Sequence, residues 1–325
     1  MIHVLLTGRH DYTITTFLAS GGEALAPTLC ARAWSAVFRQ RTLPAGTYIL
    51  SDFDRLRPHA LRRASAVADA LEASDAARLY NHPARVLGRF ELLRRLHADG
   101  LNPFSVHRLD ALPDSVRFPV FVRMASDHQG PRTALLHSRA AVEAAADALA
   151  RRRKPRDDMI VVEFQETIDE RGQYRKYGAF RVGDRIVPRH LFFGRQWQRK
   201  SPANHLDWQF DEEEAYLRDN PHEQELLQIF TMAGIDYGRI DYALVADRVC
   251  VWEINTNPMI SIDLDATTGR PGAMNALFHA SFREAMLAID TEGGGEIDVR
   301  GTRPRIWKRL RRPWRARSGP YKPLA

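Results

Sequence analysis

Alternating apolar and polar residues predict two adjacent strands in the C-terminal half of the chain, at Ile240–Val245 and at Val249–Ile254. The three residues between them form a tight turn. Asp241 then lies near the start of the first strand, and Glu253 and Asn255 lie at the end of the second. Because side chains two residues apart in a strand point to the same side, Glu253 and Asn255 are expected to share one face of the sheet.

These side chains suggest a metal site. Three oxygen-bearing side chains that converge on one face suit a hard cation such as Mg²⁺, particularly one held between protein and phosphates. Glu253 follows Trp252 in an otherwise apolar run, where a carboxylate without a partner would be costly to bury. A cation shared with Asp241 and Asn255 would remove that cost. The alternative is that all three are solvated residues of an ordinary hairpin.

The same segment resembles the C-terminal signature of the ATP-grasp superfamily, most closely the form in D-alanine–D-alanine ligases. There an Arg-x-Asp strand precedes a strand that ends in Glu-x-Asn-Thr-x-Pro. The matching positions are Arg239, Asp241, Glu253, Asn255, Thr256 and Pro258. The resemblance implies that Asp241, Glu253 and Asn255 bind Mg²⁺ or Mn²⁺ against the phosphates of ATP, and that Arg239 stabilises an oxyanion. Met259 replaces a glycine of those ligases, so their amino-acid substrate does not carry over.

Two further segments resemble, more weakly, the parts of ATP-grasp proteins that contact the phosphates of ATP. Phe118–Arg123 resembles the strand whose last basic residue contacts the α- and β-phosphates, although relatives usually have lysine where this chain has Arg123. Arginine supplies charge and two hydrogen bonds, but as a planar fork. The segment Ser126–Gly130 lies where relatives have a flexible glycine-containing loop. With one glycine, it is also consistent with an ordinary turn.

A further strand is predicted at Ile160–Phe164. The resemblance places it before the adenine site, and implies that backbone groups near three residues bind the base. These residues are Glu163, Phe164 and Gln165.

The sequence Gly183-Asp184 predicts a hairpin over residues 174–190. Lys176 enters this hairpin among basic and aromatic neighbours. The resemblance implies that Lys176 contacts a phosphate, and the alternative is a charged, exposed strand edge.

Helices are predicted from apolar residues three and four apart. The sequence Asn81-His82-Pro83 is expected to open a helix that runs to His97, because an N-cap residue followed by proline is typical of a helix start. Its inward face would hold Val86, Phe90, Leu93 and His97. Other helices are expected at 61–71, 139–153, 222–233 and 273–289.

The elements indicate an α/β (α+β) class. The resemblance implies an ATP-grasp fold, in which two α+β lobes clamp ATP after a small N-terminal α/β domain. The expected divisions are 1–79 for that domain, 80–290 for the ATP-grasp domain with a clamp subdomain at about 103–165, and 291–325 for a flexible basic tail. In the first domain, strands are predicted at Ile2–Leu6 and Thr47–Ser51. The Asp52 and Asp54 pair that follows could bind a ligand, but capping of a turn is the favoured interpretation.

Charge separates the tail from the rest of the chain. Residues 300–325 contain ten lysines and arginines and no acid, whereas the whole chain has a formal net charge of +7. The preceding residues therefore carry a net negative charge. A basic tail suits an anionic lipid, a nucleic acid or an acidic partner, and a disordered solubilising tail is an equally good interpretation.

The composition indicates the broad class of protein and little more. The chain is 44% apolar and 27% charged, which is typical of a globular protein. No run reaches the length of a transmembrane helix, and no signal peptide is recognised, so a cytoplasmic location is expected. Cys30 and Cys250 suggest neither a disulfide framework nor a zinc site.

The resemblance implies an ADP-forming ligase that joins a carboxylate to an amine, on small molecules or peptides, through an acylphosphate. ATP and Mg²⁺ are the implied cofactors, and Arg123, Lys176 and Arg239 would neutralise developing charge. One alternative is a nucleotide-binding or scaffold protein with weakened chemistry, favoured by Arg123 in place of lysine. The other is nucleic-acid or anionic-membrane binding through the tail, which would fall steeply with salt.

Overall fold

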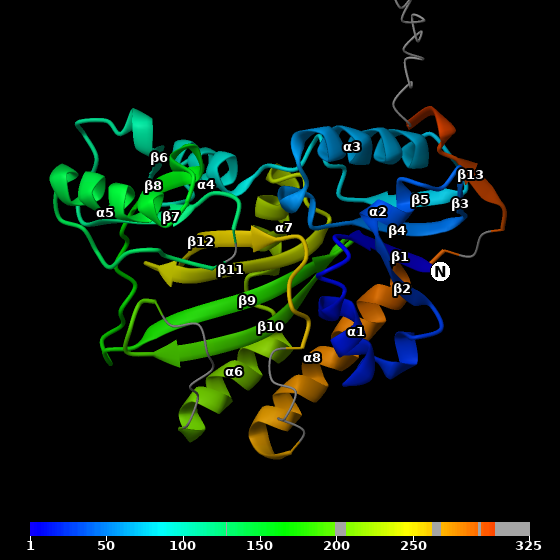
Figure 1. Cartoon of the computed structure of the whole chain (residues 1–325). Helices are drawn as coiled ribbons and strands as arrows, with labels where there is room; N and C mark the ends of the chain where they lie inside the picture. The colour runs from blue at the N-terminus through cyan, green and yellow to red at the C-terminus, as the bar shows by residue number, and fades with distance from the viewer. Residues whose placement is uncertain (128, 199–205, 262–267, 292–293, 303–325) are drawn as a thin grey trace, which may run out of the picture.

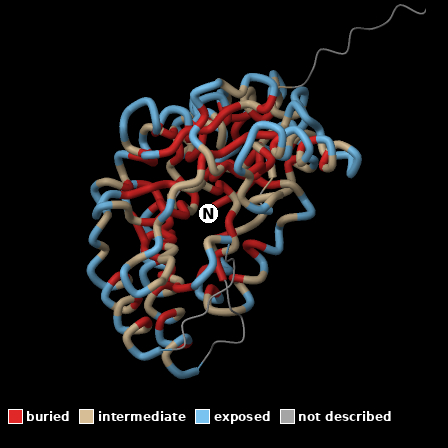
Figure 2. Tube along the Cα trace, turned by 90° about the vertical axis from the view of Figure 1, so that its left-hand side faces the viewer, coloured by how far each residue is buried: buried red, intermediate tan, exposed pale blue. Residues whose placement is uncertain are grey.

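The chain forms three lobes, and the middle lobe is built on a central antiparallel sheet (Figure 1). The computed structural model describes residues 1–127, 129–198, 206–261, 268–291 and 294–302. In these residues the two larger sheets have four strands each, and smaller sheets have three and two. Figure 2 shows buried segments gathered in the interior of the molecule and exposed ones around its periphery.

The N-terminal lobe is a parallel sheet with the strand order β2-β1-β4-β5. Its strands are β1 (Ile2–Leu6), β2 (Leu29–Ala33), β4 (Gly46–Leu50) and β5 (Ala77–Tyr80). All residues of β1 and β4 are buried, because α3 (Pro58–Glu72) packs on one face and α1 (Tyr12–Ala19) and α8 (Gly269–Ala288) pack on the other. Parallel strands covered on both faces have continuous apolar sequences. The strands predicted in this domain are confirmed, with the second shifted by one residue.

The central sheet consists of two antiparallel hairpins side by side, in the order β10-β9-β11-β12. They are β9 (Tyr174–Val182) with β10 (Arg185–Gly194), and β11 (Tyr237–Val245) with β12 (Arg248–Asn255). Gly183 turns the first hairpin with φ +61°, a conformation that favours glycine. The helices α4 (Arg89–Ala98), α6 (Asp207–Asp219) and α7 (Glu223–Met232) pack against this sheet. Both predicted hairpins are confirmed.

The third lobe is a small antiparallel sheet with the order β6-β8-β7, covered by α5 (Arg139–Arg151). Its strands are β6 (Val106–Arg108), β7 (Val120–Met124) and β8 (Met159–Glu163). The helix, which was predicted at 139–153, buries Val142, Ala146 and Leu149. These elements fall within the segment expected to clamp the nucleotide.

The helix start expected at Asn81-His82-Pro83 is wrong, because α4 begins only at Arg89, whereas its end at Ala98 is one residue from the predicted one. Asn81 has φ +64° and makes tertiary hydrogen bonds instead of capping a helix. Its Nδ2 donates to Leu50 O and Tyr237 O, and its Oδ1 accepts from the backbone N–H groups of Asp236 and Tyr237, at 2.7–3.1 Å. Of the predicted inward residues, Leu93 is buried, Val86 and Phe90 pack partly buried against the same core, and His97 is exposed. Leu92 and Leu96 complete the buried face of α4.

The boundary expected at residue 291 is too early. Strand β13 (Glu296–Asp298) pairs with β3 (Thr42–Pro44), and Ile297 and Val299 are buried in the core under α3. The last strand of the fold is therefore contributed by the segment that precedes the basic stretch. Residues 303–325, where the basic tail was predicted, lie outside the described residues. No helix of the described residues is long and apolar enough to span a membrane.

Asn81→Ala tests the link between the N-terminal lobe and β11. The variant removes four buried hydrogen bonds and places alanine, which tolerates positive φ less well than asparagine, at φ +64°. We expect the free energy of unfolding to fall by about 3 kcal/mol in denaturant titration. Gln224→Ala, an exposed amide on α7, is the control and should change little. Equal losses in the two variants would contradict this role of Asn81.

Candidate active site

A cavity of about 390 Å³ lies where the three lobes meet. It is bounded by α1 and the Arg55 turn on the N-terminal side, by β7 and the end of β8 on the clamp side, and by the central sheet. The residues predicted from the C-terminal motif line it together: Arg239, Asp241, Glu253 and Asn255. Arg123, Lys176, Phe164 and Gln165 line it as well.

The central sheet brings the motif residues into register. Asp241 is paired with Glu253 across β11 and β12, and Arg239 is paired with Asn255. Asn255 Nδ2 donates to Glu253 Oε1 at 3.2 Å, so the predicted shared face is confirmed. A β-bulge opposite Asp241 and Tyr242 inserts Trp252, which allows Trp252 and Glu253 both to reach the cavity.

Glycine is required beside Asp241 on the neighbouring strand. Gly178 pairs with Asp241 on one side and with His190 on the other. A Cβ atom at Gly178 would lie 2.3 Å from the imidazole of His190. The ring therefore occupies the space of the missing side chain. Burial, followed by the charges of Arg239, Lys176 and Arg189, holds the pKa of His190 well below its ordinary value. The ring is accordingly neutral.

Two arginines neutralise Glu253. Its Oε2 lies 2.5 Å from Arg123 Nη2 and 2.9 Å from Arg89 Nη2. The Glu253 side chain is 15% exposed. Burial acts to raise the pKa of Glu253, but the charges of Arg123 and Arg89 outweigh it and hold the pKa well below its usual range. Glu253 is therefore ionised.

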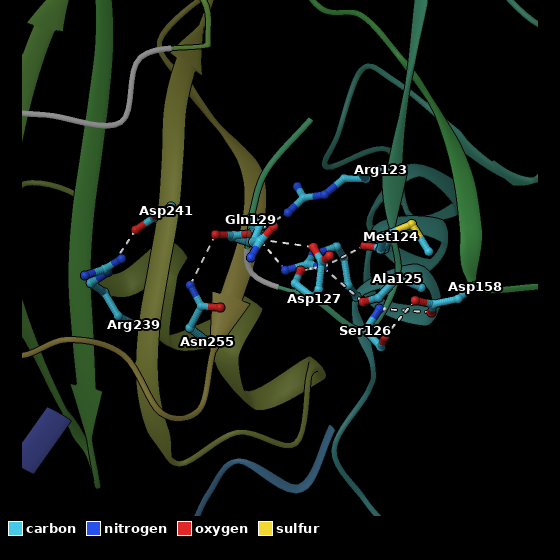
Figure 3. A network of polar contacts seen from close by, with 12 residues as sticks. Arg123, Met124, Ala125, Ser126, Asp127, Gln129, Asp158, Arg239, Asp241 and Asn255 are labelled. Carbon is cyan, nitrogen blue, oxygen red and sulfur yellow. Dashed lines mark hydrogen bonds and ion pairs between the residues drawn. The ribbon is translucent and has the colours of Figure 1, made fainter. Parts of the chain in front are cut away.

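Asp241 also has two cationic partners. Lys176 Nζ lies 2.7 Å from Asp241 Oδ2. Arg239 Nε donates to Asp241 Oδ1 at 3.0 Å (Figure 3). The Asp241 side chain is only 2% exposed. Arg239 also donates from Nη1 to Met259 O at 3.2 Å, which ties the loop after β12 to the sheet.

Arg89 is a residue that the sequence analysis missed. It is the first residue of α4, and its side chain is 6% exposed. Besides Glu253, its Nη1 donates to the backbone carbonyls of Met124, Ala125 and Asp127, in the segment that leaves β7. Figure 3 shows this segment beside Arg123. Arg89 therefore links the candidate phosphate loop to Glu253. No spacing pattern signals such a contact, because 164 positions separate the two residues.

The oxygen atoms of this site fit a hard divalent cation. Asp241 and Glu253 supply carboxylates from adjacent strands, and the buried Oδ1 of Asn255 has no hydrogen-bond partner in the described residues. Carboxylate and amide oxygens are the donors that Mg²⁺ takes in proteins. The described residues contain no group of three His, Cys, Asp or Glu side chains placed to bind a metal. The third protein ligand would therefore have to be Asn255.

The side chain of Glu163 makes hydrogen bonds within the clamp lobe and does not line the cavity. The carboxylate accepts hydrogen bonds from the backbone N–H groups of Ser105 and Arg117, at 3.1 and 3.0 Å. The backbone N–H groups of Glu163 and Phe164 bind the carbonyls of Ser105 and Pro119. Glu163 thus braces the clamp lobe, and neither of these two N–H groups is available to a base. The expected adenine contact at 163–165 stays a prediction.

Aromatic rings line the clamp end of the cavity. The Trp197 ring lies 5.0 Å from that of Phe121 and 5.4 Å from that of Phe164 between centroids, and all three residues line the cavity. Such a group suits a flat heteroaromatic ring. Trp197 follows β10 and was not predicted, since a single tryptophan in a loop carries no pattern.

Arg89→Met tests the buried network. It leaves Glu253 with one cation fewer and three carbonyls without their donor, so we expect the free energy of unfolding to fall by about 3 kcal/mol. Arg85→Met is the control, because its ion pair with Glu72 is exposed and should contribute little. The double variant Arg89→Met/Glu253→Gln should recover stability relative to Arg89→Met. A double variant that shows the sum of the two losses would contradict the coupling.

The chain matches no family model and no curated protein. Solved structures do match it. The ATP-grasp ligase PsnB, complexed with minimal precursor, is 14% identical with a TM-score of 0.51, over 88% of this chain and 98% of that one. The D-alanine–D-alanine ligase from Bacillus anthracis is 11% identical with a TM-score of 0.49, over 88% and 99%. The D-cycloserine synthetase DcsG is 18% identical with a TM-score of 0.45, over 87% and 99%.

At these identities the likeness concerns the fold. The match to PsnB extends over nearly the full length of both chains, with a parallel N-terminal sheet followed by antiparallel sheets in this chain. The fold predicted from the motif Arg239–Pro258 is thereby confirmed: the chain has the ATP-grasp fold.

Proposed function

We propose that this chain is an ATP-dependent ligase that joins a carboxylate to an amine through an acylphosphate and releases ADP and phosphate. The observation that carries the proposal is the cavity between the lobes, which Asp241, Glu253 and Asn255 line together with Arg123, Lys176 and Arg239. The likeness to a ligase complexed with a precursor supports small-molecule or peptide substrates.

The nucleotide would lie along the cavity from the clamp lobe to the central sheet. Phe121, Phe164 and Trp197 offer apolar faces to the adenine. Arg123 and Lys176 line the cavity beside the two carboxylates, where they would contact phosphate oxygens. The carbonyl groups near Gln165 remain the candidates for hydrogen bonds to the base.

Asp241, Glu253 and Asn255 would hold Mg²⁺ or Mn²⁺. A bound divalent cation neutralises phosphate oxygens and makes the terminal phosphorus more electrophilic. The carboxylates of Asp241 and Glu253 cannot bind a metal ion while they keep all their present contacts with basic side chains. We therefore expect Arg123 and Lys176 to turn from the carboxylates to the phosphates when the nucleotide binds. Arg89 keeps its place, because three backbone carbonyls hold its guanidinium.

In the reaction, an oxygen of the substrate carboxylate attacks the γ-phosphorus, and the bond from that phosphorus to ADP breaks. Arg123 and Lys176 stabilise the charge that develops on the phosphoryl oxygens. The amine nitrogen then attacks the acyl carbon, phosphate leaves, and the nitrogen loses a proton. Arg239 faces the oxyanion of that step. The lobes exclude water, which would otherwise hydrolyse the acylphosphate.

A second candidate is a nucleotide-binding protein without ligation. Each carboxylate already has two cationic partners in the described residues, so the network can hold the lobes together without a metal. Binding through the basic tail concerns residues outside the described part of the chain.

Product analysis tests the proposal most directly. The purified protein with Mg²⁺, ATP and a fractionated cell extract should give extract-dependent ADP and phosphate, with a product one water lighter than its two parents by mass spectrometry. AMP in place of ADP would contradict the acylphosphate. An absence of turnover, with ATP still raising the melting temperature, would favour the second candidate.

Glu253→Gln should abolish metal-dependent formation of ADP, because it removes the charge that holds the cation. Glu284→Gln, at an exposed carboxylate on α8, is the matched control and should keep full turnover. The melting temperature of Glu253→Gln shows whether the variant is folded. Undiminished turnover in a folded Glu253→Gln variant would exclude the metal assignment.

Arg239→Ala should lower amide formation by about 100-fold or more, as expected when an oxyanion donor is lost. The affinity for the nucleotide, measured by calorimetry, should change much less. A variant that bound ATP weakly but formed the amide at the normal rate when saturated would show that Arg239 does not act on the oxyanion.

A further inference from the structure

The N-terminal sheet has its own candidate binding position, at the point where the strand order reverses. From β1 the chain passes to β2 on one side, whereas β4 pairs with β1 on the other. In open parallel sheets, ligands bind at the carboxyl ends of two strands related in this way. Here those ends lead into Thr7–His10 after β1 and into Asp52–Arg55 after β4.

Asp52 organises this position. Its side chain is 2% exposed, and it has φ +58°. Its Oδ2 accepts hydrogen bonds from Thr7 N at 3.0 Å and from His10 Nδ1 at 2.8 Å. Its Oδ1 lies 2.8 Å from Arg55 Nε. Asp52 therefore joins the two strand ends and fixes Arg55, which goes beyond the turn cap expected from the sequence.

Arg55 presents the rest of its guanidinium to the cavity. The side chain is 37% exposed and lines the cavity together with Tyr12 and Thr13. Asp52 engages Nε, and neither Nη atom has a partner within the described residues. A guanidinium held at one edge, with donors left on the other, matches the two oxygens of a carboxylate.

The position of Arg55 relative to Arg239 indicates which substrate it meets. Thr13 Oγ1 donates a hydrogen bond to Asn257 Oδ1 at 2.8 Å, and Arg239 Nη1 donates one to the backbone carbonyl of Met259. The loop 257–259 is thus fastened to the N-terminal lobe at one end and to the central sheet at the other. Figure 1 shows the clamp lobe and the N-terminal lobe on opposite sides of β11 and β12. A substrate beside Arg55 approaches Arg239 from the side away from the aromatic end.

We propose that Arg55 binds a free carboxylate of the substrate that supplies the amine, so that this substrate is an amino acid or a short peptide. The inference rests on the proposed function for the order of the substrates. Asp52 is a positioning residue that holds the guanidinium, and Arg55 makes the contact. The amine then lies between Arg55 and Arg239, within reach of the acyl group.

The test is direct binding to the full chain, saturated with Mg²⁺ and a non-hydrolysable ATP analogue. The probes are the common amino acids in both enantiomers, a set of dipeptides, the primary amide of each, and phosphoethanolamine. Calorimetry or ligand-observed NMR should find at least one carboxylate that binds at least 10-fold more tightly than its amide. Binding of phosphoethanolamine alone, or of no carboxylate, would overturn the proposal.

Arg55→Gln should lower the affinity for that carboxylate by 10-fold or more and leave the affinity for its amide unchanged. Arg55→Lys should recover part of the affinity for the carboxylate. Arg57→Gln, at an exposed arginine two positions away that does not line the cavity, is the control and should bind like the wild type. Unchanged affinity for the ATP analogue shows that each variant is folded. If Arg55→Gln lowered the affinities for the carboxylate and for its amide equally, the contact between Arg55 and the carboxylate would be refuted.

The outcomes separate this inference from the proposed function. Carboxylate binding that depends on Arg55, in a protein that turns over no ATP, would refute the ligase and retain the anion site. Turnover with a carboxylate-free amine at the normal KM would refute the anion site and retain the ligase.

Discussion

The compensation of two buried carboxylates by basic side chains from different lobes is the constraint on which the rest of this structure depends. Glu253 is 15% exposed and Asp241 is 2% exposed, and an ionised carboxylate at such a site is stable only when its partners are well placed. Arg89 comes from the start of α4, Arg123 comes from the clamp sheet, and Lys176 and Arg239 come from the central sheet. The lobes must therefore meet at one position, and the cavity lies where they meet.

Local backbone features allow this arrangement. The bulge at Trp252 keeps Glu253 opposite Asp241 and still exposes the indole to the cavity, whereas Gly178 leaves room for the His190 ring beside Asp241. Asn81 gives the N-terminal lobe a fixed relation to β11 through four hydrogen bonds. The clamp lobe is linked to β12 by the ion pair of Arg123 with Glu253, so a displacement of this lobe would change both the cavity and the partners of Glu253.

The sequence was sufficient to predict the parts of the site that are close together along the chain. Arg239, Asp241, Glu253 and Asn255 lie on two strands joined by a short turn, and the two-residue period of a strand determines their common face. Arg89 and Trp197 could not be predicted, because their contacts join segments that no local periodicity relates. Arg55 pairs locally with Asp52, but no local pattern shows that its side chain reaches the cavity. The helix expected at Asn81 was wrong for a related reason: a cap followed by proline is a local signal, and hydrogen bonds to Leu50 and Tyr237 override it.

The balance of charge around the two carboxylates bears on the proposed nucleotide site. Four cations contact Asp241 and Glu253, so these six side chains carry two more positive than negative charges, although Lys176 is 34% exposed and the charge of Asp54 also acts on Arg89. A network that served only to hold the lobes together would be more stable with equal numbers, since surplus buried charge is costly. A divalent metal would increase the surplus further, and only a polyanion could then restore the balance. ATP is such a polyanion, and its phosphates would supply the negative charge that the isolated chain lacks. The positive surplus is thus what the proposed binding of a metal–nucleotide complex requires.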